Sequence, residues 1–353
     1  MKYKTLFFLT FPILVVVSVV AVNYFPEEVT LLNSVSNKIE NVQPAFLSTS
    51  KPLDILFTGD IMLARHVEKL MEREGVNYPL ANIKFDSSLD YLVGNFEGSI
   101  PKVHHPTASF TFSFSVPESS LTLLENHGFT HLSLANNHSY DFGASNFLHT
   151  KSVIDKTNIK SFGDQVLNPS TTVTYINHGK DKIALIGIYA VYRIPDQEKL
   201  KQIFSEANTK AGQQIVYVHW GEEYELQHSA NQEALATEWI NLGADLIIGH
   251  HPHVVQDIQI INGKLVLYSL GNFIFDQYFS EDVQMGLLVK LTKSKKEEQI
   301  ELLPVSSMGS LSSPYYMNPA DKDNFLQALA KRSDPRLTPQ ILAGILDLKG
   351  LSQ

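Results

Sequence analysis

The chain has 353 residues, which is enough for one large domain with extensions or for two modest domains. Its formal net charge of −9 argues against nucleic acid as the main partner, because phosphate binding needs clustered Lys and Arg side chains. The sequence contains no cysteine, which excludes disulfide scaffolds, thiolate metal sites, Cys nucleophiles and a lipid-modified cysteine.

The N-terminal 25 residues predict a transmembrane helix. Lys2 and Lys4 precede an uncharged run at residues 5–25 that is rich in Leu, Val and Phe, and about 20 apolar residues suffice to cross a bilayer. Lysines before the run favour a cytoplasmic amino terminus, with the remainder of the chain outside. The alternative is a cleaved signal peptide, for which Ala21-Val22-Asn23 is a poor cleavage site. We therefore expect a single-pass cell-membrane protein with an extracytoplasmic C-terminal domain, joined by a polar linker at residues 26–52.

Residues 53–305 predict an α/β domain in which buried strands and helices alternate. Strands are expected at residues 53–57, 89–93, 129–135, 183–190, 215–218 and 245–248, and helices at 61–74, 121–127 and 231–242. Two hairpins are expected later, one through Asn262-Gly263 and one through the charged turn at residues 293–298. The Phe-x-Phe-x-Phe alternation at residues 110–114 predicts a further strand with one apolar face. Residues 306–353 are expected to form a C-terminal helical extension that packs outside the functional site.

Short polar clusters follow six of the apolar runs. They contain Asp60, Glu97, Asn136-Asn137-His138, His219, His250-His251-Pro252-His253 and Asn272. In an open α/β sheet, residues just past the carboxyl ends of the strands gather at one rim, where ligands bind. Asp, Glu, Asn and His supply the oxygen and nitrogen donors that hold divalent metals. The clusters therefore predict a metal site.

The pair His251 and His253 carries the strongest single indication of metal binding. Two positions apart in an extended chain, these side chains point to the same side and can reach one metal or one phosphoryl group, whereas His250 points to the other. Taken alone, Asp60 fits a helix cap as well as a ligand. A lone His219 more often has a structural role.

The sequence leaves the roles of Glu97 and His138 open. Glu97 fits a metal ligand and a surface loop acid equally well. His138 fits a ligand or a donor to a developing oxyanion, and Asp141, three residues later, is placed to orient its ring.

Taken in order, these motifs resemble those of the CapA family of poly-gamma-glutamate capsule proteins, over about residues 53–303. The resemblance is carried by Thr58-Gly59-Asp60, Gly94-Asn95-Phe96-Glu97, Asn136-Asn137-His138 with Asp141, His219-Trp220-Gly221-Glu222, His251-Pro252-His253-Val254 and Gly271-Asn272-Phe273-Ile274-Phe275-Asp276. The family looks like a branch of the calcineurin-like metallophosphoesterases. The resemblance therefore implies a metallophosphoesterase-like sandwich of two mixed β-sheets flanked by helices.

Matching motif by motif, the resemblance also implies roles for individual residues. The implied ligands of a divalent metal ion (Mn, Zn, Fe or Mg) are Asp60, Glu97, Asn137, His219, His251 and His253. The implied role of His138 is to assist the leaving group, with Asp141 beside it. Typical metallophosphoesterases open with Asp-x-His, but here Ile61 and Met62 follow Asp60. One metal of a dinuclear centre would therefore lose a ligand.

Two functions remain open from the sequence. The first is a metal-dependent hydrolase in which an activated water attacks a phosphoester or amide and His138 protonates the leaving group. The second is a membrane-anchored assembly or tethering component that binds an anionic polymer without turnover. The resemblance implies a part in poly-gamma-glutamate biosynthesis, export or retention. The expected partners are that polymer or a phosphoester, the membrane, and other capsule-synthesis membrane proteins.

Overall fold

The computed structural model describes residues 51–108, 111–179, 181–191 and 193–352. Residues from Lys51 onward form one compact unit. The predicted transmembrane helix at residues 1–25 and all but the last two residues of the predicted linker lie outside the described residues. Within the described ranges, none of the helices combines the length and the apolar character needed to span a bilayer.

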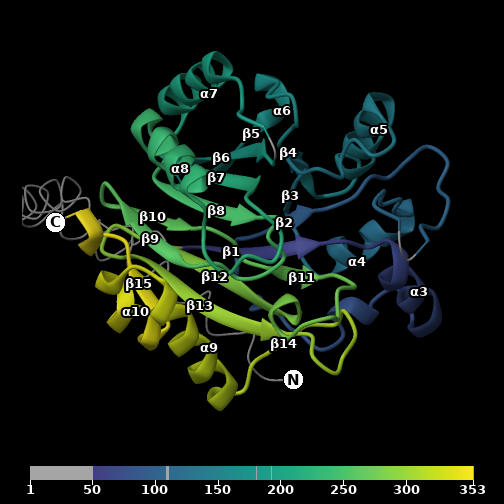
Figure 1. The fold of residues 1–353 in the computed structure, drawn as a ribbon. Helices are drawn as coiled ribbons and strands as arrows, with labels where there is room; N and C mark the ends of the chain where they lie inside the picture. Colours follow the sequence, from purple (N-terminus) through teal and green to yellow (C-terminus); the bar gives the residue numbers. More distant parts are fainter. Residues whose placement is uncertain (1–50, 109–110, 180, 192, 353) are drawn as a thin grey trace, which may run out of the picture. The chain divides into compact units, whose positions relative to one another are not determined.

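Two mixed β-sheets lie at the centre of this unit (Figure 1). The first sheet has the order β14-β13-β12-β1-β2-β3-β4, with β11 paired to β1 and β15 paired to β13. Strands β1 to β4 run parallel, and the later strands β12 and β13 add antiparallel pairs. Its strands are β1 (Leu53–Ile61), β2 (Tyr91–Phe96), β3 (His131–Ser133), β4 (Lys160–Phe162), β11 (Asn272–Ile274), β12 (Met285–Lys293), β13 (Glu298–Ser306), β14 (Tyr315–Tyr316) and β15 (Ile345–Asp347).

The second sheet has the order β5-β6-β7-β8-β10-β9. Its middle strands β6, β7, β8 and β10 are parallel, and β5 and β9 pair antiparallel at the two edges. The predicted hairpin through Asn262-Gly263 is confirmed as β9 and β10. The strands are β5 (Val173–His178), β6 (Asp181–Ala190), β7 (Gln213–Trp220), β8 (Leu246–His250), β9 (Ile258–Ile261) and β10 (Lys264–Leu267).

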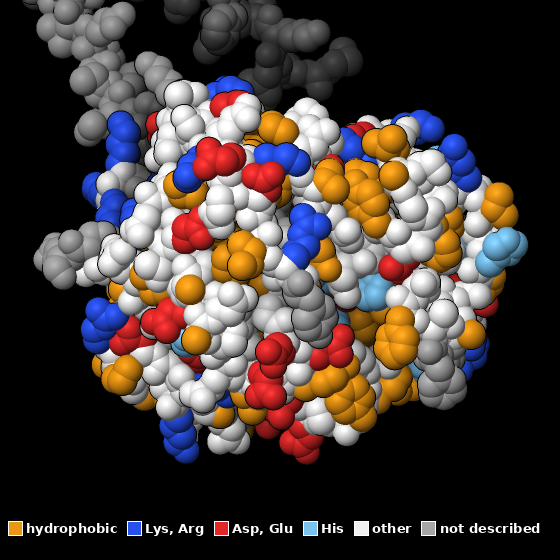
Figure 2. All heavy atoms as spheres, turned by 45° about the horizontal axis from the view of Figure 1, so that its top comes forward, with side chains coloured by type: hydrophobic (Ala, Val, Ile, Leu, Met, Phe, Trp, Pro, Cys, Tyr) orange, Lys and Arg blue, Asp and Glu red, His pale blue; other side chains and the backbone are white. Residues whose placement is uncertain are grey.

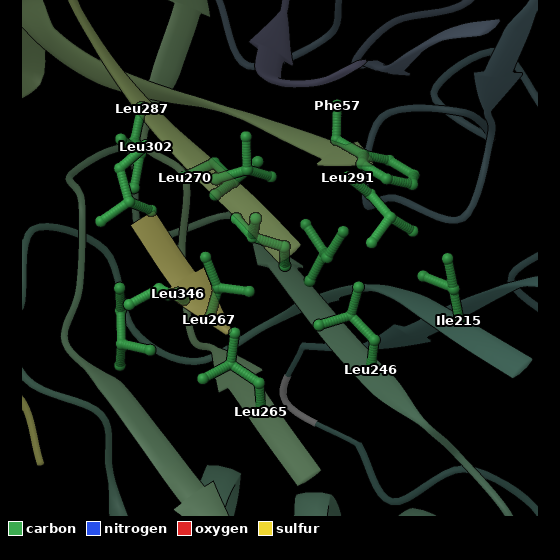
Figure 3. Packing of buried hydrophobic residues seen from close by; sticks show 14 of the residues in the cluster. Phe57, Ile215, Leu246, Leu265, Leu267, Leu270, Leu287, Leu291, Leu302 and Leu346 are labelled. Carbon is green, nitrogen blue, oxygen red and sulfur yellow. The ribbon is translucent and has the colours of Figure 1, made fainter. Parts of the chain in front are cut away.

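Helices flank the sheets, and three hydrophobic clusters hold the layers together. One cluster lies between the sheets and contains Phe57, Leu291 and Leu302 from the first sheet with Ile215, Leu246 and Leu265 from the second (Figure 3). The other two clusters join each sheet to its own helices. The described helices are α3 (Arg65–Glu74), α4 (Leu121–Asn126), α5 (Ala144–Ile154), α6 (Pro169–Thr172), α7 (Gln197–Lys210), α8 (Ala230–Leu242), α9 (Pro319–Arg332) and α10 (Thr338–Ala343). The expected sandwich of two mixed sheets flanked by helices is confirmed.

Three local features differ from the expectations. The predicted helix at residues 61–74 begins only at Arg65, because β1 continues through Ile61. The strand predicted at residues 110–114 is wrong over residues 111–114, which form no regular element. Residues 306–353 contribute β14 and β15 to the first sheet as well as helices.

Candidate metal centre

The carboxyl ends of β1, β2, β7 and β8 bring two groups of metal-ligand side chains together. The first group consists of Asp60, Glu97 and His219, all buried. The second consists of Glu223, His251 and His253. Within each group, one donor atom from each residue lies within 4.8 Å of the others. The ring centroids of His219 and His251 are 4.8 Å apart, so the two groups are adjacent.

Asparagine side chains connect the members of the first group. Asn95 Nδ2 donates to Asp60 Oδ1 at 2.8 Å and lies 3.3 Å from Nδ1 of His219. The other nitrogen of that ring, Nε2, lies 2.8 Å from Oδ1 of Asn137. The structure therefore places Asn137 against His219, while Asn95 spans the Asp60 and His219 side chains.

Glu97 is the clearest sign that the centre is built for a cation. Its side chain is fully buried, and neither carboxylate oxygen has a hydrogen-bond partner among the described residues. The nearest ionisable nitrogens, His138 Nε2 and His253 Nε2, each lie 3.8 Å from Oε1. Burial, and next the negative charge of Asp60, raise the pKa of Glu97 well above its usual value. An unsatisfied buried acceptor costs about 1–3 kcal/mol, and a bound divalent cation would remove that cost.

The segment of His251 and His253 is not extended, so the reason given for their pairing is wrong. Their φ angles are 100° and 60°, in the left-handed region that non-glycine residues rarely adopt. The backbone bends after β8, so that the His251 amide donates to Asp60 Oδ2 at 3.3 Å. Both side chains nevertheless belong to one donor group. Such backbone strain costs about 1–3 kcal/mol per residue and is concentrated at functional sites.

The neighbouring His250 lies outside both donor groups, as expected. Its Nε2 lies 3.1 Å from the carbonyl oxygen of Thr58, and its Nδ1 lies 3.3 Å from that of Val218. These contacts tie β8 to β1 and β7. His250 therefore connects the three strands whose carboxyl ends lead to Asp60, His219 and His251.

Burial and the charges of neighbouring groups shift the pKa values of His251, His253 and Asp60 by different amounts and in different directions. Burial, and next the charge of His253, lower the pKa of His251 to about 3, which leaves this ring neutral and able to bind a metal. Burial also acts to lower the pKa of His253, but the charges of Glu97 and Asp60 outweigh it and raise the value to about 9. For Asp60, burial acts to raise the pKa, but the hydrogen bond from His253 and the neighbouring charges outweigh it, so the pKa falls below the usual value. Without a metal, a proton on His253 therefore balances the buried carboxylates.

The sequence interpretation missed Glu223. This residue lies in the exposed loop that follows β7, between Glu222 and Tyr224. Its position just past the carboxyl end of a strand is the same signal that pointed to the other ligands. In the sequence, however, no feature distinguishes Glu223 from Glu222 and Glu225 as a ligand. Only the fold shows that the Glu223 carboxylate lies near His251 and His253.

His138 and Asp141 form a pair beside the first donor group. His138 Nδ1 lies 3.0 Å from Asp141 Oδ2, and its Nε2 lies 3.8 Å from Glu97 Oε1. Ser99 Oγ reaches the carbonyl oxygens of His138 and Ser139 at 2.8 and 2.9 Å, which fixes the backbone of this turn. The amide nitrogen of Asn137, Nδ2, lies 3.1 Å from His138 Nε2. An imidazole held by a carboxylate on one nitrogen and directed at the centre with the other can act as a proton donor when Nε2 carries a proton.

Comparison with known proteins gives consistent sequence matches. The family model described as "Bacterial capsule synthesis protein PGA_cap" matches residues 54–277, more than half of the chain. The "Capsule biosynthesis protein CapA" of Bacillus anthracis is 28% identical over 316 residues, covering 83% of this chain and 77% of that protein. The "PGA biosynthesis protein CapA" of Bacillus subtilis (strain 168) is 29% identical over 303 residues, covering 80% and 79%.

Similarity to solved structures is more distant. A phosphatase of Mycoplasma pneumoniae is 14% identical with a TM-score of 0.42, covering 78% of this chain and 99% of that chain. A hypothetical protein of Thermus thermophilus is 14% identical with a TM-score of 0.44, covering 75% and 99%. Family membership therefore rests on the sequence matches.

Proposed function

The chain belongs to the bacterial capsule synthesis protein family PGA_cap, and we propose that it is a membrane-anchored, extracytoplasmic, metal-dependent hydrolase that serves poly-gamma-glutamate biosynthesis, export or retention. Its relatives in two Bacillus species are named for capsule and PGA biosynthesis, which supports the choice of polymer. The predicted apolar segment at residues 5–25 supports the membrane location. Other membrane proteins of capsule synthesis are the partners that this location favours.

The observation that carries the hydrolase proposal is the position of His138. Its Nε2 faces Glu97 of the first donor group, and Asp141 holds the opposite nitrogen. Hydrolysis of an amide or phosphoester needs a proton donor beside the activated water, whereas simple polymer binding needs none. A His–Asp pair at this distance from a buried donor group therefore favours turnover over tethering.

The donor set fits a divalent cation of the Mn, Zn, Fe or Mg type. Asp60, Glu97 and His219 would hold one ion, with Asn137 against His219, and Glu223 would complete a second group with His251 and His253. A cation held by these residues would supply Lewis-acid chemistry and would lower the pKa of water at the site. Glu223 thus offers the second group a carboxylate where the sequence lacks an Asp-x-His partner.

The protein residues would then divide the remaining work. The Nε2 of His138 donates its proton to the leaving nitrogen or oxygen, and Asp141 Oδ2 fixes the ring through Nδ1. Asn95 Nδ2 contacts both Asp60 and His219 and so fixes the position of one side chain relative to the other. Because Asp60, Glu97 and His219 are almost completely buried, bulk water is excluded from the inner side of the centre.

A tethering function is the second candidate, and the acidic loop after β7 favours it. Glu222, Glu223 and Glu225 are all exposed in this loop. On the face drawn in Figure 2, Asp and Glu side chains form several groups, the largest near the lower centre, with Lys and Arg side chains between and around them. An acidic surface repels a polyanion unless cations lie between the surface and the polymer. Bound divalent cations would then bridge the polymer carboxylates to this loop.

Incubation of the purified full-length protein with poly-gamma-glutamate, and separately with a phosphoester such as p-nitrophenyl phosphate, distinguishes the two functions. Each divalent ion is tested in turn, and polymer length or released phosphate is measured. The hydrolase proposal expects turnover that falls about 100-fold or more in His138→Gln, with metal content retained. Stoichiometric metal and polymer binding without turnover of either substrate would instead establish tethering.

A further inference from the structure

Phe114 is a buried residue in a segment without regular secondary structure. The aromatic side chain of Phe112, two residues earlier, is 83% exposed, whereas that of Phe114 is 3% exposed. In a strand with one apolar face, both residues would lie on that face. Their opposite environments show that a specific tertiary contact buries the Phe114 ring. The Phe114 carbonyl oxygen also accepts from the Ser99 amide at 2.9 Å, beside an isolated β-bridge between Ser99 and Ser115.

The contact that buries the Phe114 ring is with the proton-donor pair. The Phe114 ring stacks on the imidazole of His138, with centroids 3.8 Å apart and an interplanar angle of 25°. The backbone amide of Phe114 donates to Asp141 Oδ2 at 2.6 Å. The same oxygen lies 3.0 Å from His138 Nδ1. One residue therefore holds both members of the pair, the first through its ring and the second through its backbone.

Helix α3 holds this segment from the other side. The guanidinium carbon of Arg65, the first residue of the helix, lies 4.6 Å from the centroid of the Phe114 ring. One residue after Phe114, Ser115 Oγ lies 2.8 Å from His104 Nδ1, and His104 Nε2 lies 2.7 Å from Glu68 Oε1. The segment is thus attached to α3 at two points.

Ser115, His104 and Glu68 are connected in the order of a serine hydrolase triad, but their surroundings indicate a structural role. Ser115 is 2% exposed, so a substrate has no path to its hydroxyl. Its backbone amide is already occupied by a hydrogen bond to Thr107 Oγ1 at 3.0 Å, and is not available to stabilise an oxyanion. These contacts hold residues 104 and 107 against Ser115.

We propose that Phe114 is the positioning residue of His138. This inference rests on the proposed hydrolase function. The contacts of His138 Nδ1 with Asp141 Oδ2 and of His138 Nε2 with Asn137 Nδ2 at 3.1 Å still leave the imidazole free to tilt about the axis that joins them. Stacking on Phe114 fixes the plane of the ring, and with it the direction of the Nε2 proton. Displacement of a catalytic group by about 1 Å can reduce the rate about 100-fold, so loss of the ring is expected to lower kcat more than KM.

The test is a cycle of variants of the full-length, metal-loaded protein, assayed on poly-gamma-glutamate and on p-nitrophenyl phosphate. Phe114→Leu is expected to lower kcat about tenfold or more with KM nearly unchanged. Phe114→Tyr keeps the stacked ring and is expected to restore kcat. Phe112→Leu is the matched control, because that side chain is exposed. Metal content is measured for every variant.

The decisive comparison is made in the His138→Gln background. If Phe114 acts through His138, Phe114→Leu causes no further loss of kcat there. An equal loss in both backgrounds, or no loss in either, overturns the inference. If the wild type turns over neither substrate, the proposed function fails on its own. The wild type, Phe114→Leu, His138→Gln and the double variant are then compared by their unfolding equilibrium constants. A coupling of about fivefold between the two substitutions supports the stacking contact, and additivity overturns it.

Discussion

His138 Nε2 lies 3.8 Å from Oε1 of Glu97. A nitrogen able to carry a proton thus faces a buried carboxylate that accepts no hydrogen bond from the described residues. The two side chains come from turns after β3 and β2, adjacent parallel strands of the first sheet. The sheet therefore places the proposed proton donor beside the proposed metal ligand, and each side chain can be replaced separately.

Replacement of Glu97 by Gln separates metal binding from folding. Burial and the charge of Asp60 raise the pKa of Glu97 well above its usual value. This shift favours the neutral carboxyl group, which Gln matches closely in shape and charge. We expect the metal-free free energy of unfolding to change by less than about 1 kcal/mol. The metal affinity is expected to fall about 100-fold or more. Calorimetric titration and thermal unfolding check both; equal metal affinity in the variant would exclude Glu97 as a ligand.

The metal-free protein is expected to lose stability as the pH rises. The pKa of His253 is raised to about 9 in the folded protein, against about 6.5 when unfolded. Its contribution is therefore complete below about pH 6.5 and is lost as the pH rises through 9. The raised pKa of Glu97 acts in the same direction. Thermal midpoints measured from pH 6 to 10 should decline in the wild type and decline less in His253→Gln; a rising midpoint would contradict this assignment.

Metal binding should release protons near neutral pH, because His253, whose pKa is raised to about 9, must lose its proton to act as a ligand. The number released is obtained from titration calorimetry in buffers of different ionisation enthalpy. We expect net proton release, and apparent affinity that increases with pH up to about 9. A binding enthalpy independent of the buffer would show that His253 is not a ligand.

Glu223 and Glu222 form a matched pair of exposed acids in one loop. Only Glu223 lies within reach of His251 and His253. We expect Glu223→Gln to weaken or remove one class of bound metal, and Glu222→Gln to leave metal content unchanged, since the two substitutions change net charge equally. Metal analysis after dialysis measures the difference. Equal metal content in the two variants would mean that the net charge of the loop, and not the position of Glu223, determines metal binding.

Gly59 is expected to be indispensable for the position of Asp60. A Cβ atom at this residue would come far inside van der Waals contact with the carbonyl oxygen of Gly271, which accepts the Asp60 backbone amide at 3.0 Å. Gly59→Ala should therefore cost about 3 kcal/mol of stability. Gly212→Ala is the control, because a Cβ there meets nothing within 4 Å. Urea unfolding of both variants provides the measurement, and equal midpoints would contradict the close approach.

Much of the site could be predicted because it depends on strand ends. Buried apolar runs locate β1, β2, β7 and β8, and parallel strands place their carboxyl ends at one rim. Asp60, Glu97 and His219 follow directly from that argument. His251 and His253 were predicted together, but for a wrong reason, since the left-handed backbone of both residues depends on contacts after β8 that periodicity does not report.

The remaining residues depend on tertiary contacts. Glu223 is one of three exposed acids in a loop, and the sequence offers no ground for choosing among them. The alternation around Phe114 is typical of a strand, yet this residue is buried by stacking on His138, 24 positions later in the chain. A local pattern cannot distinguish a side chain that faces a sheet from one that stacks on the imidazole of a distant residue.

The measurement that tests the central claim most directly is the metal content of the full-length protein after saturation with Mn, Zn, Fe or Mg in turn and removal of free ions. The account predicts at least about one divalent ion per chain in the wild type. It also predicts loss of bound metal in Asp60→Asn, and in the double variant His251→Ala with His253→Ala. A wild type that retains no divalent ion at a stoichiometric level under any of these conditions would contradict the metal centre and the hydrolase proposal with it.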